Sequence, residues 1–206
     1  MAGHALALVG TAKGGFLLRS DRARQRWELE GPLLAGMEVN HMVFDRRDGT
    51  IYAAVNSYQY GATVHRSTDM GKSWSHSSEG LRYAADDQEK VKRVWHVEPG
   101  PASEPGVVYA GVEDSGLFRS EDGGQTWREL SALRQHPTHA QWFPGNGGKC
   151  LHSIALDPNH PGRLYIAAST GGIYRSDDNG ESWRPINKGI RAPFMPEGQQ
   201  YPEAGQ

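Results

Sequence analysis

The 206-residue sequence contains a single cysteine, Cys150, so the chain cannot form an internal disulfide bond. It has no run of Lys or Arg, and its formal net charge of −2 does not support a nucleic-acid-binding surface. No apolar stretch approaches the length of about 20 residues that a membrane span needs. The first ten residues lack a basic segment, so their apolar character indicates a strand and not a signal peptide. These absences lead us to expect a cytoplasmic protein with neither a nucleic-acid nor a membrane partner.

The sequence does contain an internal repeat of the form Arg-Ser-x-Asp-x-Gly-x-(Ser/Thr)-Trp. Complete copies occupy residues 66–74, 119–127 and 175–183, and a degenerate copy runs over 19–27. The Ser and Asp side chains suit a tight turn because they accept hydrogen bonds from nearby backbone N–H groups. The Gly permits a positive φ, and the Trp brings a large apolar surface to the next strand. We therefore expect the Asp residues to be structural, and the absence of alternating oxygen ligands and a terminal Glu excludes a calcium loop.

The spacing of the copies predicts an all-β repeat architecture. Their serines are separated by 47, 53 and 56 residues, in the range of propeller blades with loop insertions. Short β-rich runs between turn residues predict four strands in each of the last three units and three strands in the first. We expect one continuous array over residues 1–206, with four-stranded antiparallel blades. Its units are 1–36 (partial), 37–90, 91–149 and 150–206.

The repeat resembles the Asp-box, or bacterial-neuraminidase (BNR), repeat, and the chain resembles a BNR-repeat β-propeller of the sialidase-like and sortilin-like superfamily. The similarity runs from about Leu6 to Trp183 and includes bacterial BNR-like proteins that carry the label glycosyl hydrolase. Sialidases, xyloglucan-degrading enzymes, sortilin-type receptors and non-enzymatic assembly factors share this repeat, so the resemblance implies a fold and not one activity. The first unit lacks the first strand of a four-stranded blade, which is the strand needed to close a ring. We therefore expect either that the chain is part of a larger ring or that its open blade edge is covered by something else. An open blade edge would favour self-association.

In propellers of this kind, binding sites lie on the loop face opposite the Asp boxes, which in this sequence collects the long insertions. Alignment of the predicted innermost strands puts Asn40, Arg93 and His152 at equivalent positions near the channel mouth. There they either line a ligand pocket or hydrogen-bond neighbouring blades. Trp142 is expected to be an accessible aromatic side chain that stacks on a ligand. The complete candidate site comprises Asn40, Tyr58, Tyr60, Arg93, Glu113, Asp114, His139, Trp142 and His152.

No sialidase catalytic residue can be assigned. The sequence has no Arg-Ile-Pro motif, and the segment at 191–193, which reads Arg-Ala-Pro, lies at the wrong end of the chain. A glycoside hydrolase of another type needs two carboxylates across a cleft. In this sequence, the two carboxylates could be Glu113 or Asp114 on one side of the cleft and Asp86 or Asp87 on the other.

A zinc site is not indicated, because Pro137 separates His136 from His139 and no matching Cys/His pair occurs elsewhere. We therefore expect no metal and no cofactor. The sequence favours a binding or assembly scaffold for a protein or carbohydrate ligand. The alternative is a carbohydrate-active glycoside hydrolase, exo-sialidase-like by its family label, with carboxylates on the same face.

Overall fold

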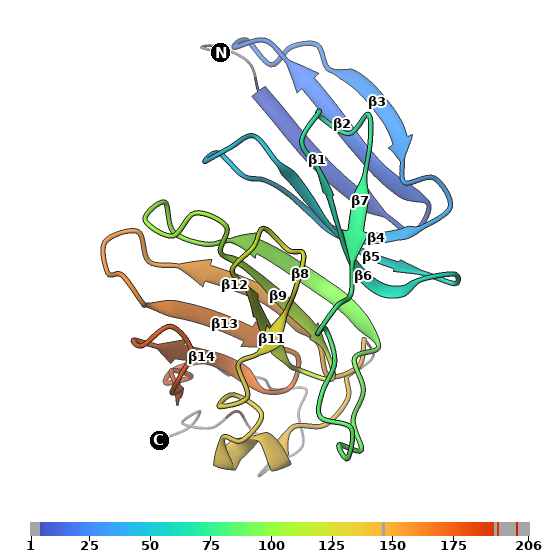
Figure 1. Ribbon diagram of the computed structural model, residues 1–206. Coiled ribbons are helices and arrows are strands. Elements are labelled where there is room, and N and C mark those ends of the chain that lie inside the picture. Colours follow the sequence, from blue (N-terminus) through green and yellow to red (C-terminus); the bar gives the residue numbers. More distant parts are fainter. Residues whose placement is uncertain (1–4, 146, 192, 194–200, 202–206) are drawn as a thin grey trace.

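The computed structural model describes residues 5–145, 147–191, 193 and 201 of the chain. Within these residues the chain forms β-strands and one short 3-10 helix (Figure 1). The strands make one three-stranded and three four-stranded antiparallel sheets, each in chain order. No helix in this part of the chain is long and apolar enough to cross a membrane.

Each sheet is a consecutive piece of the chain. The first contains Ala5–Thr11 (β1), Gly14–Ser20 (β2) and Glu28–Leu33 (β3). The second contains Glu38–Phe44 (β4), Ile51–Ser57 (β5), Gly61–Ser67 (β6) and Ser75–Ser77 (β7). The third contains Arg93–Pro99 (β8), Val108–Glu113 (β9), Leu117–Ser120 (β10) and Arg128–Glu129 (β11). The fourth contains Leu151–Leu156 (β12), Leu164–Ala168 (β13), Gly172–Ser176 (β14) and Arg184–Pro185 (β15), and the helix η1 covers Pro137–Gln141.

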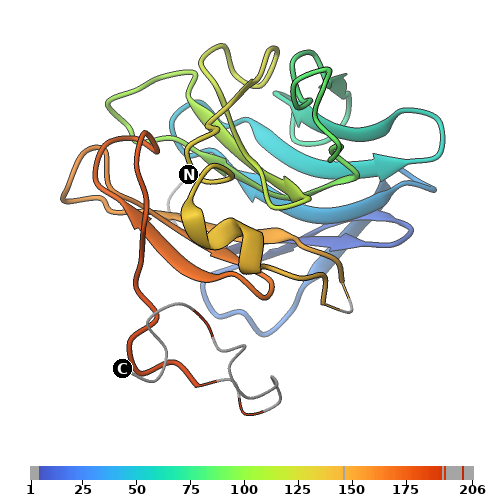
Figure 2. The same cartoon turned by 90° about the horizontal axis from the view of Figure 1, so that it is seen from below.

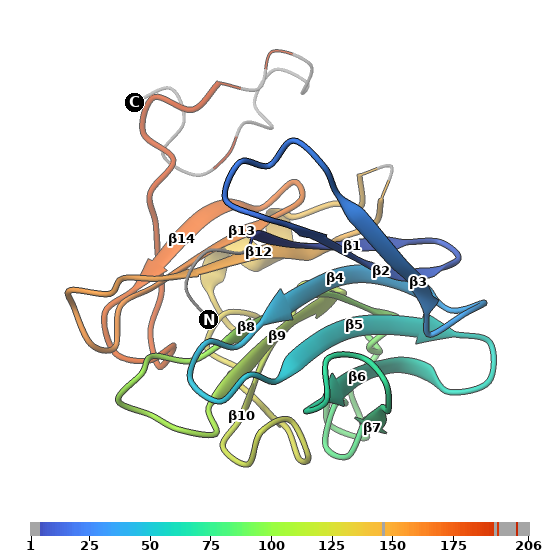
Figure 3. The ribbon, with the colours of Figure 1, turned by 90° about the horizontal axis from the view of Figure 1, so that it is seen from above.

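The predicted all-β fold of blade-like antiparallel sheets is confirmed, including the three strands of the first sheet. The innermost strands β1, β4, β8 and β12 lie next to one another in that order, and the outer strands splay away from them (Figures 2 and 3). The outermost strands of the complete sheets begin only after the Asp-box turn. Strand β7, for example, begins at Ser75, because Ser73 is still part of the Asp-box turn.

Apolar side chains are buried between successive sheets, and strand β5 shows how the sequence achieves this. Ile51, Ala53 and Val55 belong to the cluster shared with the first sheet, whereas Tyr52 and Ala54 belong to the cluster shared with the third. Successive side chains of a strand point to opposite faces, so a continuous apolar run serves two interfaces at once. The middle strands are therefore buried on both sides and make the array rigid.

Each complete Asp box is a hydrogen-bonded turn between the third and fourth strands of its sheet. In the last copy Ser176 Oγ donates to Asp178 Oδ1 (2.7 Å) and accepts from the amide of Gly180 (2.8 Å). Asp178 in turn accepts from the amide and the hydroxyl of Ser182 at 2.9 and 2.6 Å. The copies at 67–73 and 120–126 form the same set of bonds. The predicted structural role of the Asp residues is confirmed.

The box glycines also determine how closely neighbouring sheets pack. Gly71, Gly124 and Gly180 have φ of +90°, +82° and +92°, a region that residues with a Cβ rarely adopt. A Cβ at Gly71 would lie 2.9 Å from Leu33, and one at Gly180 would lie 2.8 Å from Leu130, both in the preceding unit. Each turn therefore contacts the unit before it.

The degenerate copy keeps part of this turn. Ser20 Oγ donates to the carbonyl of Arg26, and Asp21 accepts from two amides that follow it. Its tryptophan differs, since Trp27 is 42 % exposed whereas Trp183 of the last copy is 7 % exposed. The aromatic side chain of the first sheet therefore does not fill the space that the other copies fill.

Asp122→Ala is expected to lower the free energy of unfolding by about 1–2 kcal/mol. The Asp122 carboxylate accepts hydrogen bonds from the amides of Gln125 and Thr126 and from the hydroxyl of Thr126, and the substitution removes this acceptor. Asp86→Ala is the matched control, since Asp86 is exposed and forms no hydrogen bond or ion pair with another described residue. Chemical denaturation measures both variants. An equal loss in the two would contradict the structural role.

Acid should weaken the Asp boxes. The hydrogen bond from the Ser73 hydroxyl is the main cause that lowers the pKa of Asp69 to about 2. For Asp122, burial opposes the shift, but hydrogen bonds from Thr126 lower its pKa to about 2. A free Asp titrates near pH 4, so both groups contribute their full stability above about pH 4 and lose it as the pH falls towards 2. Thermal unfolding between pH 7 and pH 2 should show Tm falling below about pH 4, and less steeply for Asp122→Asn. A Tm that stays constant over this range would be inconsistent with the assignment.

Candidate ligand-binding groove

A groove of about 350 Å³ opens on the face that carries the turns between second and third strands. In an antiparallel sheet these turns emerge at the end opposite the Asp-box turns, because the strand direction alternates. The groove also includes residues that lead into β4 and β8. Its lining residues are Ala12, Gly36, Glu38, Asn56, Ser57, Tyr58, Gly61, Lys92 and Arg93.

Equivalent ends of two adjacent sheets build this groove. Glu38 pairs with Asn56 at the end of the second sheet, and Arg93 pairs with Glu113 at the same end of the third. The Arg93 guanidinium lies 3.8 Å from the Glu38 carboxylate and 4.0 Å from that of Glu113. The ion pair between Arg93 and Glu38 therefore bridges the two sheets at the groove.

The predicted alignment of Arg93 with Asn40 and His152 is wrong. A β-bulge in each of β4, β8 and β12 leaves Asn40, Trp95 and His152 as the extra residues of the three strands. Trp95 therefore takes the position that the sequence alignment gave to Arg93. A bulge adds one unpaired residue to a strand, and a strand pattern does not show where this happens.

Asn40 and Asn56 hold the backbone of the neighbouring sheet beneath the groove. Asn40 Nδ2 donates to the Val94 carbonyl at 2.9 Å, and Asn56 Oδ1 accepts from the Val94 amide at 3.0 Å. Asn40 thus has the second of its two predicted roles, which is to connect neighbouring blades. Asn56 also connects the two blades, and in addition it lines the groove.

The cation next to Arg93 is also paired. Lys92 Nζ lies 2.9 Å from a carboxylate oxygen of Asp114, whose side chain is 8 % exposed. The hydrogen bond to Asp114 is the main cause that raises the pKa of Lys92. Glu113 and Asp114 therefore adjoin the groove through Arg93 and Lys92, as neighbours of the lining and not as part of it.

Two tyrosines lie in or beside the β5–β6 turn, and they differ in their surroundings. Tyr58 lines the groove and is fully exposed. Tyr60 is 43 % exposed, and its ring centroid lies 4.6 Å from that of His76 on β7. The aromatic surface available to a ligand in the groove is therefore the ring of Tyr58.

Two carboxylates of the insertion before β8 and one of β11 surround a single arginine. Arg134 contacts Asp87, Glu89 and Glu129 at distances of 2.8, 2.9 and 3.2 Å, and its guanidinium lies 3.7 Å from the centre of the Tyr83 ring. The hydrogen bond from Arg134 lowers the pKa of Asp87. This cluster fastens the insertion before β8 to the insertion after β11.

The carboxylate pairing suggested by the sequence is not present as a free pair. Asp87 is engaged by Arg134 and Asp114 by Lys92, while Asp86 is exposed and has no hydrogen bond or ion pair in the described part of the chain. Among the described residues, no group of three His, Cys, Asp or Glu side chains could hold a metal ion.

Comparison with known proteins agrees with this architecture. The BNR/Asp-box repeat family matches residues 174–185. An oligoxyloglucan-reducing end-specific xyloglucanase of Emericella nidulans is 35% identical over 80 residues, which are 38% of this chain and 9% of that protein. A vacuolar protein sorting/targeting protein 10 of Fusarium vanettenii is 25% identical over 92 residues, 44% of this chain and 5% of that protein. The GH74 xyloglucanase of Xanthomonas campestris has a similar structure, with a TM-score of 0.61 and 22% identity over 90% of this chain and 29% of that one.

The chain is built of Asp-box (BNR) repeats and has the fold of part of a β-propeller. It spans about a tenth or less of the length of the curated relatives that it matches. Its sheets correspond to part of the larger GH74 propeller chain. These relatives differ in what their names say they do, so the similarity shows the fold and leaves the function open.

In this Asp-box propeller, Trp142 is a core residue, and the prediction that it is accessible is wrong. Its side chain is 6 % exposed, and its Nε1 donates to the hydroxyl of Tyr174 at 3.3 Å. The ring lies so close to Gly171 that a Cβ there would be 2.6 Å from it. The reason is that η1 folds the long insertion back onto the fourth sheet, where an aromatic side chain gains more from burial than from solvent.

The two remaining predicted residues also lie outside the groove lining. His139 is in η1 with its ring centroid 4.8 Å from that of Trp142, and burial lowers its pKa. His152 is exposed on β12, with Nδ1 2.9 Å from Ser153 Oγ. The structure thus brings Tyr58 and Arg93 together in the groove, with Glu113 and Asp114 beside it.

Four polar lining residues of the propeller's groove were not predicted, namely Glu38, Asn56, Ser57 and Lys92. The sequence does hold a signal for two of them. Glu38 is the first residue of β4 and Lys92 directly precedes β8, and charged residues at these strand starts lie at the loop end of a sheet. Asn56 and Ser57 carry no comparable signal, because they are polar residues at the end of the buried strand β5, next to a turn.

Trp142→Ala is expected to lower the free energy of unfolding by roughly 3–5 kcal/mol, the cost of removing a large buried side chain. His152→Ala, which changes an exposed residue of the same unit, should stay within about 0.5 kcal/mol of the parent protein. Denaturant titration of both variants distinguishes the two environments. A Trp142→Ala variant as stable as the His152→Ala variant would mean that the insertion does not pack as described.

Proposed function

We propose that this Asp-box propeller binds a polysaccharide chain in the groove beside Tyr58. The observation that carries the proposal is a fully exposed aromatic ring at the edge of an open, polar groove. A sugar ring has an apolar face that packs on an aromatic side chain, and its hydroxyl groups need polar partners at the edge. The groove offers both within one surface.

The polar lining is varied enough to recognise sugar hydroxyls. Glu38 supplies acceptors, Arg93 and Lys92 supply donors, and the amide of Asn56 and the hydroxyl of Ser57 belong to the same lining. The volume of about 350 Å³ falls within the range of about 300–1,000 Å³ for small-molecule sites. A groove of this size would hold a short stretch of a longer chain.

The relatives support the choice of a polysaccharide over other polar polymers. The Emericella nidulans relative and the Xanthomonas campestris structure both carry the name xyloglucanase. Xyloglucan is therefore the first polysaccharide to test. From these relatives we carry over to this chain the class of ligand, a polysaccharide, and not the reaction.

The charged groups around the groove favour binding over cleavage. Glycoside hydrolysis uses two carboxylates that flank the scissile bond, and each must be free to exchange a proton or attack the sugar. Glu38 and Glu113 both contact Arg93, and Asp114 contacts Lys92. In the described part of the chain, the carboxylates at the groove are therefore engaged by cations.

Tyr58→Ala should weaken binding of a xyloglucan oligosaccharide by about 1–3 kcal/mol, or roughly 5- to 150-fold in Kd, because it removes the stacking surface. The melting temperature should change little, since the ring contributes no buried area. Isothermal titration calorimetry measures the first quantity and thermal unfolding the second. Trp27→Ala is the matched control, because Trp27 is an exposed aromatic between β2 and β3, outside the groove lining.

Equal affinity in the Tyr58→Ala variant and the parent protein would remove the groove from consideration. Loss of binding in Trp27→Ala alone would move the site to the first sheet. A reducing-sugar assay on the same samples tests cleavage, and release of reducing ends that Glu113→Gln abolishes would replace the binding proposal with the hydrolase alternative.

A further inference from the structure

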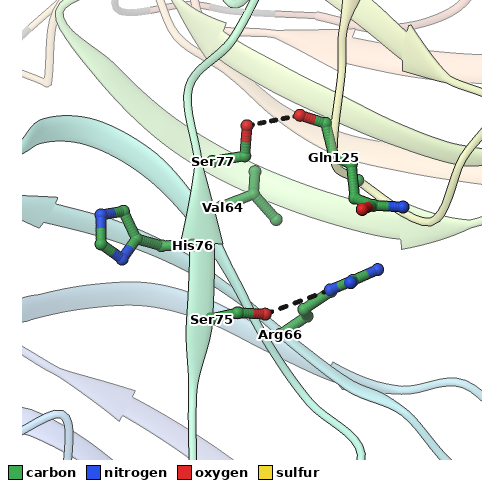
Figure 4. Close-up of a pocket in the computed structure, with 7 residues that line it drawn as sticks. Val64, Arg66, Ser75, His76, Ser77 and Gln125 are labelled. Carbon is green, nitrogen blue, oxygen red and sulfur yellow. Dashed lines mark hydrogen bonds between the residues drawn. The ribbon is translucent and has the colours of Figure 1, made fainter.

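A second cavity, of about 260 Å³, lies between the outer strands of the second sheet and the Asp box of the third (Figure 4). It is separate from the groove, because the two share no lining residue. Its lining consists of Val64, Arg66, Ser75, His76, Ser77, Gly124 and Gln125. The charged group in this lining is the arginine that opens the first complete Asp box.

The corresponding arginines of the other two boxes are neutralised by carboxylates. Arg119 contacts Glu121 and lies 2.8 Å from Glu104. Arg175 lies 2.6 Å from Asp177. Glu121 and Asp177 occupy the same place in the repeat, directly after the serine. An acidic side chain at that place is therefore the partner of the box arginine in both copies.

The first complete box breaks this pattern. Thr68 stands where the other copies have Glu and Asp, and Arg66 has no carboxylate within ion-pair distance in the described part of the chain. Its Nε donates to Ser75 Oγ at 3.1 Å, and its Nη1 donates to the Gly123 carbonyl at 3.3 Å. The guanidinium thus keeps its positive charge uncompensated in the wall of a cavity.

The other polar groups of the cavity surround this charge. Figure 4 shows the side chains of Arg66 and Gln125 on one side of β7, whereas His76 points to the other side, where it stacks on His65. Ser75 Oγ accepts its hydrogen bond from Arg66, so its own hydrogen is left for another acceptor. The Gln125 amide uses one donor on the Asp122 carbonyl and has a second to offer.

We propose that this cavity binds a small hydroxylated carboxylate. The carboxylate would take the place that Glu121 and Asp177 take in the other boxes, against the planar guanidinium of Arg66, which matches a carboxylate in shape and charge. The ligand's hydroxyl groups would pair with Ser75 and Gln125. Both sugar acids and short hydroxy acids have this chemistry, and the proposal does not depend on the groove beside Tyr58.

The repeat itself supplies a variant that tests the proposal. Thr68→Asp introduces the residue found at the same place in the last box, so it should supply Arg66 with an internal carboxylate that competes with the ligand. Thr68 is exposed, as are Glu121 and Asp177, so the fold should accept the change. Thr68→Asn is the matched control, because it has the size of Asp without the charge.

Glucuronate, malate and glucose are titrated into the parent protein and the two variants, with binding followed by calorimetry and by the NMR signal of Arg66 Nε–H. Glucuronate or malate should bind the parent protein and Thr68→Asn alike, and glucose should bind neither. Thr68→Asp should bind the acid about tenfold or more weakly, the scale of one charge-assisted hydrogen bond. The acid that binds more tightly shows whether the ligand is a sugar acid or a short hydroxy acid.

Three results would overturn the proposal: no response to either acid, glucose binding as tightly as glucuronate, or undiminished acid binding in Thr68→Asp. Thermal unfolding of each variant ensures that the titrated protein is folded. Arg66→Gln provides a second test, since it removes the charge and should reduce acid binding at least as much as Thr68→Asp.

Discussion

The architecture depends on the hydrogen-bonded turn in which a serine and an aspartate of each Asp box accept amide protons. This turn joins the third and fourth strands and holds Met70 and Asn179 at φ of +62° and +59°, a conformation that costs energy for residues with a Cβ. The glycine that follows each of them approaches the preceding unit closely. One local motif therefore sets both the shape of a sheet and the spacing between sheets.

The Asp boxes hold one end of each complete sheet, and the opposite end is held differently. There the sheets are connected by side chains and not by a repeated turn. Asn40 and Asn56 bind the backbone of β8, and Arg134 contacts two carboxylates of the insertion before β8 and one of β11. These contacts position the groove on a rigid support, as is usual for binding sites formed by loops.

Differences between the repeats are informative because the copies share one backbone. Thr68 replaces an acidic residue and leaves Arg66 without the carboxylate that Arg119 and Arg175 have. Trp27 stays exposed where Trp183 is buried. In a repeat protein the other copies serve as internal controls, so a deviation in one copy points to a local role.

The sequence by itself determined the class of fold, the order of the strands and the structural role of the Asp boxes, because the hydrogen bonds that define each box lie within nine consecutive residues. It also named Tyr58 and Arg93, two residues that line the groove, although Arg93 was named from a strand alignment that the structure contradicts. Only the tertiary structure decided the rest. The bulge that puts Trp95 at the place predicted for Arg93, the burial of Trp142 and the pairing of Glu38 with Arg93 arise where segments far apart in the chain meet. Each of these contacts depends on side chains from two separate segments. A short stretch of sequence contains only one of the two, so it cannot predict the contact.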